Sequence, residues 1–227
     1  MAVNLKGMQE ISDKIIQQYK DKNGEVQQYL ADIKQIVIDS KAVLEGNYFY
    51  RHTTLEIQDE KILKQINIFW CGMQAKTRIC EIGFNAGHST MLMLLGRERT
   101  PLDFTIFDIG HHAYTKPAFH YIQGKFPHVK FEFIEGDSTI TMIDWIQNNK
   151  SLIGTYDIIH VDGGHSEHCI TNDMKHSDIL ISHNGIIVID DTDVSYINKC
   201  VNTYISSGRY IELNVLKQTK HRIIRKL

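Results

Sequence analysis

The sequence has few cysteines, almost no net charge and no long apolar run. Its cysteines are widely scattered and form no C-x-x-C pair, which argues against a disulfide framework and a thiolate zinc site. They are Cys71, Cys80, Cys169 and Cys200. The formal net charge of -2 provides no overall field to attract nucleic acid or an anionic membrane. No stretch approaches the roughly 20 apolar residues of a membrane helix, and the N-terminus lacks a signal-peptide core. We therefore expect a soluble, cytoplasmic protein without nucleic-acid or membrane partners.

The length and apolar content favour one α/β domain with an appended N-terminal segment. With 227 residues, of which 42% are hydrophobic, the chain can bury a substantial core. Apolar residues recur at helical spacing over residues 8–46 and predict two helices separated at Asn23-Gly24. After a polar and aromatic loop at residues 47–54, a third helical pattern continues to Gly72. We expect residues 1–56 to form a helical extension that covers a ligand pocket or makes a homodimer contact, and residues 57–227 to form the main domain.

Short β-rich runs bounded by turn residues alternate with helical segments in the rest of the chain. Strands are predicted at residues 78–82, 103–107, 129–134, 156–161 and 186–189. This alternation indicates right-handed crossovers and a parallel sheet with helices on both faces. The runs at residues 210–216 and 221–225 predict a final antiparallel hairpin. The expected fold is therefore Rossmann-like, with a seven-stranded, mostly parallel sheet.

A glycine-rich turn follows the first predicted strand, and in open α/β sheets ligands bind beyond the carboxyl ends of the strands. The turn reads Glu81-Ile82-Gly83-Phe84-Asn85-Ala86-Gly87-His88-Ser89. Gly83 and Gly87 allow a tight turn and a close approach to a ligand, and Ser89 can cap the next helix. The G-x-x-x-G spacing differs from the G-x-G-x-x-G of dinucleotide sites and favours S-adenosylmethionine, which has no pyrophosphate. A purely structural turn with two glycines is the alternative.

Polar residues also end the second and third predicted strands. Asp108 stands about 25 residues beyond Gly83, where a carboxylate can accept both hydroxyl protons of a ribose. Asp137 and Ser138 follow the third strand, where the edge of an adenine would lie. Asp137 can equally be the N-cap of the next helix, and the two roles are compatible.

With these residues in place, residues 57–227 resemble class I S-adenosylmethionine-dependent methyltransferases. The resemblance is strongest to metal-dependent O-methyltransferases related to catechol O-methyltransferase and to macrolide-sugar and rhamnosyl O-methyltransferases. Residues 81–90, 156–166 and 185–191 match the motifs after the first, fourth and fifth strands. The resemblance implies that S-adenosylmethionine is the cofactor and that a divalent cation, usually magnesium, binds to Asp162, Asp190 and Asp191. The cofactor contacts would be Glu81, Gly83, Phe84, Asn85, Gly87, Ser89, Asp108, Asp137, Ser138 and Asp162.

Electrostatics supports the cation site independently of the resemblance. Asp162, Asp190 and Asp191 follow neighbouring central strands and would repel one another unless a cation neutralised them. Oxygen ligands select magnesium, manganese or calcium rather than zinc. The alternative is that residues 190–193 are an acidic helix start, which would interact favourably with the dipole of the following helix.

His165 follows Asp162 at the position where catechol enzymes of this group have lysine and several sugar enzymes have histidine. This difference favours a small polyol-like acceptor, such as a sugar or nucleotide sugar. We assign His165 as the general base beside Asp162, because an imidazole near its ordinary pKa suits the removal of a hydroxyl proton. A histidine that only packs or orients Asp162 is the alternative. For the whole chain, the alternatives are a catechol or other phenol as acceptor, a hydroxylase-like relative, and a non-catalytic S-adenosylmethionine-binding domain.

Overall fold

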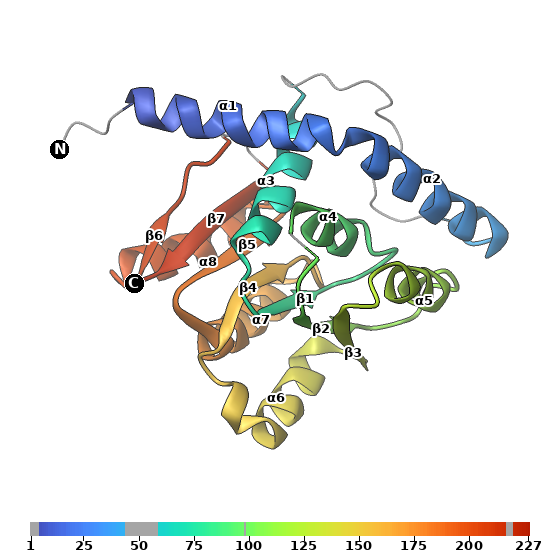
Figure 1. The fold of residues 1–227 in the computed structure, drawn as a ribbon. Coiled ribbons are helices and arrows are strands. Elements are labelled where there is room, and N and C mark those ends of the chain that lie inside the picture. The colour runs from blue at the N-terminus through green and yellow to red at the C-terminus, as the bar shows by residue number, and fades with distance from the viewer. Residues whose placement is uncertain (1–4, 44–58, 98, 217–219) are drawn as a thin grey trace.

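The computed structural model describes residues 5–43, 59–97, 99–216 and 220–227 (Figure 1). The predicted loop at residues 47–54 lies outside the described residues. Seven strands form one sheet in the order β3-β2-β1-β4-β5-β7-β6, in which β1 to β5 are parallel and β7 runs antiparallel to both neighbours. The strands are β1 (Arg78–Ile82), β2 (Leu102–Asp108), β3 (Val129–Glu135), β4 (Tyr156–Val161), β5 (Ile181–Asp190), β6 (Tyr210–Glu212) and β7 (His221–Lys226). The predicted Rossmann-like sheet with a C-terminal hairpin is confirmed.

The strand boundaries follow from burial. β1 and β4 are buried along most of their length on both faces, which is why each reads as an apolar run rather than as an alternation. The main departure from prediction is β5, which begins at Ile181 instead of residue 186. Residues 182–185 are polar and turn-like, and Asn184 adopts a left-handed φ of 65°. A register shift against β4 accommodates them, so the strand continues through a segment that looks like a loop in the sequence.

Helices cover both faces of the sheet (Figure 1). On one face, α3 (Glu60–Gln74), α4 (His88–Gly96) and α5 (Thr115–Lys125) share a core with β1 and β2. On the other face, α6 (Ser138–Asn148), α7 (Glu167–Leu180) and α8 (Ser195–Ser206) form a second core. A short 3-10 helix, η2 (Lys150–Leu152), follows α6. The predicted three-layer arrangement is therefore present.

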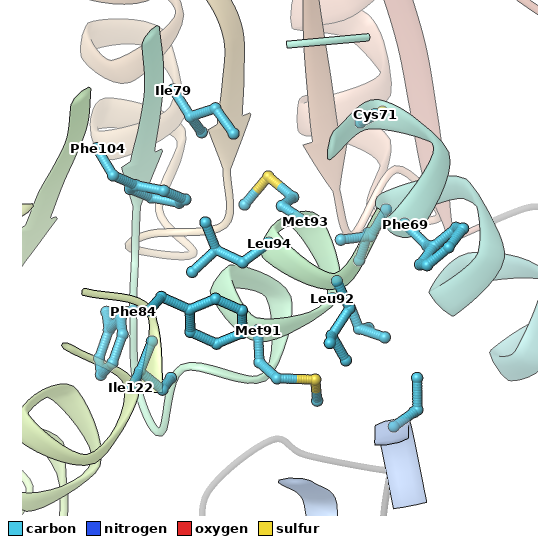
Figure 2. Packing of buried hydrophobic residues seen from close by; sticks show 14 of the residues in the cluster. Phe69, Cys71, Ile79, Phe84, Met91, Leu92, Met93, Leu94, Phe104 and Ile122 are labelled. Atoms are coloured by element: carbon cyan, nitrogen blue, oxygen red, sulfur yellow. The ribbon is translucent and has the colours of Figure 1, made fainter. Parts of the chain in front are cut away.

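Helix α4 is buried on nearly all sides, because it lies between the sheet and α3. Figure 2 shows Met93 and Leu94 of α4 among Ile79 and Phe104 of the sheet and the residues of α3. A helix in this position must be apolar around its whole circumference, and residues 91–95 are all buried hydrophobics. Because α4 starts directly after the glycine-rich turn, this packing fixes the turn relative to the sheet.

The N-terminal helices α1 (Leu5–Asp21) and α2 (Asn23–Asp39) lie outside α3, α4 and α5 (Figure 1). Tyr19, Val26 and Ile33 are fully buried and belong to the same core as the sheet. The Tyr19 hydroxyl donates a hydrogen bond of 2.7 Å to Gln65 Oε1 on α3. The described part of the predicted extension is thus a third helical layer, and its role as a pocket cover or dimer contact stays a prediction. None of the helices in the described ranges combines the length and apolarity needed to cross a membrane.

Candidate functional site

Two cavities open at the carboxyl ends of the central strands. The first, which we call the β2 cavity, has a volume of about 420 Å³ and lies at the ends of β1, β2 and β3. The second, the β5 cavity, has a volume of about 330 Å³ and lies at the ends of β1, β4 and β5 beneath α3. Both cavities are lined by Gly83, Asn85, Asp162 and His165. Two bound molecules could therefore meet at these four residues.

Gly83 is required by the contact between two turns. It has a left-handed φ of 90°, and a Cβ atom there would lie 1.9 Å from the carbonyl oxygen of Asp162. The Asp162 amide donates a hydrogen bond of 2.8 Å to the carbonyl of Ile82. The turn after β1 and the turn after β4 are thus held backbone against backbone, which places Asp162 beside the glycine-rich turn.

Gly87 is required by packing beneath the turn. It lines neither cavity, its amide donates a hydrogen bond of 2.7 Å to the Phe84 carbonyl, and its φ is 80°. A Cβ atom there would come within 2.5 Å of the Phe84 ring and of Ile122. Packing beneath the turn therefore requires a glycine at this position, and the cofactor contact at Gly87 stays a prediction.

Asp108 ties the turn to the end of β2. Its Oδ2 accepts hydrogen bonds from the amides of Phe84 at 2.7 Å and Asn85 at 2.9 Å, and its Oδ1 accepts one from Gly110 at 2.7 Å. Asp108 also lines the β2 cavity, as the predicted ribose contact requires. Each carboxylate oxygen has two lone pairs, so Oδ1 retains capacity for a hydroxyl donor. The sequence did not indicate the bonds to the turn.

Asp137 and Ser138 line the β2 cavity next to Asp108. Asp137 caps α6 by accepting from the Thr139 amide at 2.9 Å and the Thr139 hydroxyl at 2.7 Å, and these bonds hold its pKa below the ordinary value. The helix cap and the cavity position coexist, as the sequence allowed. Ser138 Oγ donates a hydrogen bond of 2.7 Å to Asp173 Oδ1 on α7. Burial raises the pKa of Asp173 to about 6.

Glu81 lies behind the turn and lines neither cavity. Its side chain is fully buried, its Oε1 is 2.9 Å from His160 Nδ1, and its Oε2 accepts from the hydroxyl of Thr90. We therefore correct the predicted cofactor contact at Glu81 to a supporting role. Burial alone would lower the pKa of His160, but the hydrogen bond to Glu81 and the attraction to Glu81, Asp162 and Asp190 together outweigh it and raise that pKa.

His160 is a site residue that the sequence analysis missed. It stands two residues before Asp162 in β4, so both side chains project from the same face of the sheet. Its Nε2 is buried and no hydrogen-bond partner reaches it from the described residues. A histidine within an otherwise apolar strand, in register with Glu81, was the signal that could have revealed it.

The three predicted cation ligands fall into two overlapping sets. His160, Asp162 and Asp190 offer ligand atoms within 4.8 Å of one another, and so do Asp162, His165 and Asp191. Asp162 belongs to both sets, whereas Asp190 and Asp191 belong to different ones. Asp191 has a left-handed φ of 53°, and its amide donates a hydrogen bond of 2.8 Å to Asp190 Oδ1. All three predicted residues line the β5 cavity, and their joint binding of one cation stays a prediction.

Lys64 is the second residue that the sequence analysis missed. It extends from α3, and its Nζ donates to Asp190 Oδ2. Burial would lower the pKa of Lys64, but attraction to Asp190 and Asp162 outweighs it and raises that pKa. The same ion pair overcomes burial at Asp190 and lowers its pKa, whereas burial and repulsion from Asp190 raise the pKa of Asp162. No sequence motif links a lysine on α3 to a carboxylate 126 residues later.

His165 lies where the two cavities meet. Its Nε2 is 2.7 Å from Asp191 Oδ2, and this hydrogen bond raises the pKa of His165. Its carbonyl accepts a hydrogen bond from the Tyr196 hydroxyl on α8. The imidazole is 67% exposed, so a bound ligand can reach it. The pairing favours the tautomer that carries its proton on Nε2, which leaves Nδ1 as the basic nitrogen.

Comparison with known families agrees with this arrangement. Residues 80–192, about half of the chain, match the model of a family described as a methyltransferase domain. The matched segment contains the glycine-rich turn, Asp108, Asp162 and the two carboxylates at the end of β5, Asp190 and Asp191. The chain therefore belongs to the class I S-adenosylmethionine-dependent methyltransferases. No curated protein sequence gives a significant match.

Solved structures with similar folds include several O-methyltransferases. An O-methyltransferase from Bacillus cereus, in complex with S-adenosylhomocysteine, has 14% identity and a TM-score of 0.60, covering 88% of this chain and 90% of its own. CalS11, a TDP-rhamnose 3'-O-methyltransferase of calicheamicin biosynthesis, has 13% identity and a TM-score of 0.59, covering 88% of this chain and 93% of its own. Methyltransferase PaMTH1 from Podospora anserina, bound to S-adenosylhomocysteine, has 18% identity and a TM-score of 0.56. The alignment covers 86% of this chain and 87% of PaMTH1. At these identities, the likeness establishes the fold.

Proposed function

We propose that the protein transfers a methyl group from S-adenosylmethionine to a hydroxyl oxygen of a small acceptor, most suitably a sugar or nucleotide sugar. The observation that carries this proposal is the junction of the two cavities at Gly83, Asn85, Asp162 and His165. One cavity suits an adenosine, and the other contains a base and several carboxylates. A methyl donor and a hydroxyl acceptor need this kind of juxtaposition for in-line transfer.

The β2 cavity has the polar groups that an adenosine requires. Asp108 supplies a carboxylate oxygen for ribose hydroxyls, and Asp137 and Ser138 supply acceptors near the edge of the base. Ile109 also lines this cavity and is 55% exposed, which provides an apolar surface for a ring to cover. When bound, S-adenosylmethionine supplies an electrophilic methyl group on its sulfonium. Gly83 and Asn85 would lie at that end, because they border both cavities.

The β5 cavity would hold the acceptor. His165 is proposed to accept the hydroxyl proton at Nδ1, while Asp191 fixes the imidazole through Nε2. Asp162, Asp190 and Asp191 would hold a divalent cation, which supplies a Lewis acid that lowers the pKa of the acceptor hydroxyl. The close carboxylate sets and the buried, unpartnered Nε2 of His160 fit a cation. Such crowding also favours an enzyme over a non-catalytic binding domain.

The choice of a sugar over a phenol rests on His165 and on fold neighbours such as the TDP-rhamnose enzyme. A catechol or other phenol in the same cavity is the second candidate. A homodimer and a cytoplasmic location also remain proposals.

Two measurements test the proposed function. Calorimetry should detect binding of S-adenosylmethionine and S-adenosylhomocysteine, with no comparable binding of nicotinamide dinucleotides. Release of S-adenosylhomocysteine should then be measured with nucleotide sugars, free sugars and catechols, each with and without magnesium. If only catechols were methylated, the acceptor would be a phenol and not a sugar. If turnover were complete in the presence of a chelator, the reaction would not need a cation. Absence of binding by both S-adenosyl ligands would contradict the proposed function.

A further inference from the structure

Lys64 brings an ammonium group into the carboxylate cluster. The side chain comes from α3 and lines the β5 cavity together with Asp162, Asp190 and Asp191. Its Nζ contacts Asp190 Oδ2, and the side chains of Lys64 and Asp190 are only 21% and 4% exposed. An ion pair with so little solvent around it is weakly screened, and removal of one partner leaves an uncompensated charge. Lys64 therefore supplies positive charge where the sequence predicts a bound cation.

Packing holds α3 in place beneath this contact. Ile62 and Ile66 on α3 are buried in the main core. Asn67 makes two hydrogen bonds to the backbone of Leu216, one of 2.8 Å to its carbonyl and one of 3.1 Å from its amide. The helix position is thus fixed by contacts that do not involve the carboxylates. A flexible lysine side chain on a fixed helix can leave Asp190 without movement of the backbone.

Both oxygens of Asp190 already have partners. Oδ1 accepts from the Asp191 amide at 2.8 Å, and Oδ2 accepts from Lys64. The Asp191 bond is local to the backbone turn and does not involve a mobile side chain. Oδ2 keeps a second lone pair, but a metal ion bound there would lie beside the ammonium of Lys64, and the two positive charges repel each other strongly at that distance. The ion therefore competes with Lys64 for Asp190.

We propose that Lys64 is a built-in competitor for the cation site: its ammonium neutralises Asp190 in the metal-free protein, and a divalent cation must displace it to bind. The proposal rests on the cation site of the proposed function, and it adds the residue that sets the affinity of that site. Lys64 is a positioning residue in this scheme, because it acts through Asp190. A cation of charge two that binds several carboxylates gains more attraction than one ammonium, so displacement is feasible but lowers the net affinity.

The test is a titration of the full chain with Mn²⁺ alone, followed by electron paramagnetic resonance of the free ion. Lys64→Met keeps a side chain of similar length without charge, and it should bind Mn²⁺ at least tenfold more tightly than the wild type. Its melting temperature without metal should fall, and saturating Mn²⁺ should raise it by more than in the wild type. Lys64→Gln retains a hydrogen-bond donor for Asp190 and should show the same tighter binding if Lys64→Met folds poorly.

Lys116→Met is the matched control for net charge. Lys116 pairs with Glu135 at 2.6 Å on an exposed edge, and neither residue lines the β5 cavity. This control should bind Mn²⁺ as the wild type does. Equal or weaker binding by both Lys64 variants, compared with a wild type that binds Mn²⁺, would overturn the competition but not the cation site. Absence of Mn²⁺ binding in the wild type and in both variants would overturn the cation site and the competition together.

Discussion

The two cavities are built in different ways. The β2 cavity depends mainly on backbone conformation, because its walls are the glycine-rich turn, the end of β2 and the start of α6. The β5 cavity depends on side chains from segments far apart in the sequence, with Lys64 from α3 meeting Asp162 after β4 and Asp190 at the end of β5. A site formed by local backbone turns can therefore be predicted from short sequence motifs. A site formed by side chains that are far apart in the sequence can be recognised only in the folded structure.

The largest predicted effect comes from the residue that joins the two cavities. Gly83→Ala places a Cβ 1.9 Å from the Asp162 carbonyl oxygen and strains a φ of 90°. The turns after β1 and β4 must separate, and we expect a loss of about 3–5 kcal/mol in the free energy of unfolding. Urea denaturation measures the loss, and calorimetry should show that binding of S-adenosylhomocysteine is abolished.

Gly24→Ala is the matched control for this change. Gly24 lies in α2, and a Cβ there meets nothing within 4 Å. Alanine should stabilise the helix by about 0.5–1 kcal/mol, because it loses less backbone entropy on folding. If Gly83→Ala were tolerated as well as Gly24→Ala, the two turns would not be held together as described.

The second prediction concerns the proposed base His165, which lies where the two cavities meet. His165→Ala should lower turnover by about a hundred- to ten-thousandfold, because the acceptor hydroxyl loses its general base. Affinity for S-adenosylhomocysteine should remain nearly unchanged, since the β2 cavity is otherwise intact. His168→Ala is the control: this exposed histidine contacts Asn172 on its own helix and lines neither cavity. Near-normal turnover in His165→Ala across pH 6 to 9 would require a different base.

Much of the fold and half of the site could be predicted from the sequence. The apolar runs define β1, β2 and β4 because buried parallel strands are apolar on both faces, whereas the edge strand β3 alternates apolar and polar residues. The turn after β1 follows from its two glycines. Asp108, Asp137 and Asp162 could be placed because residues after parallel strands meet at one edge of the sheet. The start of β5 could not be predicted, because a polar segment is included in the strand through a register shift against β4.

The remaining site residues depend on contacts across the sheet. Glu81 looks like a cofactor contact by its position in the motif, but pairing with His160 turns it into the core. Gly87 is predicted to allow close approach of a ligand, but in the structure the Phe84 ring fills the space beside it. Lys64 gives no signal in sequence because its partner is set by how α3 crosses the ends of the strands. Each of these cases needed a long-range packing contact that periodicity does not encode.

The third prediction concerns the β2 cavity alone. Asp108→Ala should weaken binding of S-adenosylmethionine about ten- to a hundredfold, as charge-assisted hydrogen bonds to the ribose are worth roughly 1.5–3 kcal/mol. The change also leaves the amides of Phe84 and Asn85 without their acceptor, so the melting temperature should fall. Asp103→Ala, at the other end of β2 and paired with Arg78 at 3.4 Å, should change neither affinity nor cavity. Calorimetry with unchanged affinity in Asp108→Ala would reject the ribose assignment.

The smallest predicted effect tests a side-chain contact behind the β2 cavity, where Ser138 meets Asp173 of α7. Asp173 on α7 accepts from Ser138 at 2.7 Å, and burial raises its pKa to about 6. The folded state therefore holds this proton more tightly than the unfolded chain, in which an aspartate titrates near 3.9. Stability from this group is present below about pH 4 and is lost as the pH rises towards 6, with an upper limit of about 3 kcal/mol.

Asp173→Asn removes the ionisation and keeps a carbonyl for Ser138. The variant should match the wild type near pH 4 and exceed its stability by about 1–2 kcal/mol at pH 7 to 8, since relaxation around a buried carboxylate reduces the full penalty. Urea denaturation across this range measures the difference. Asp178→Asn on the same helix is the control of opposite sign: hydrogen bonds from Tyr210, Arg209 and Lys226 outweigh burial and lower the Asp178 pKa, so that variant should lose stability at neutral pH. A difference between Asp173→Asn and wild type that does not change with pH would mean that Asp173 is already ionised when folded, and that Ser138 is held by a charged partner throughout.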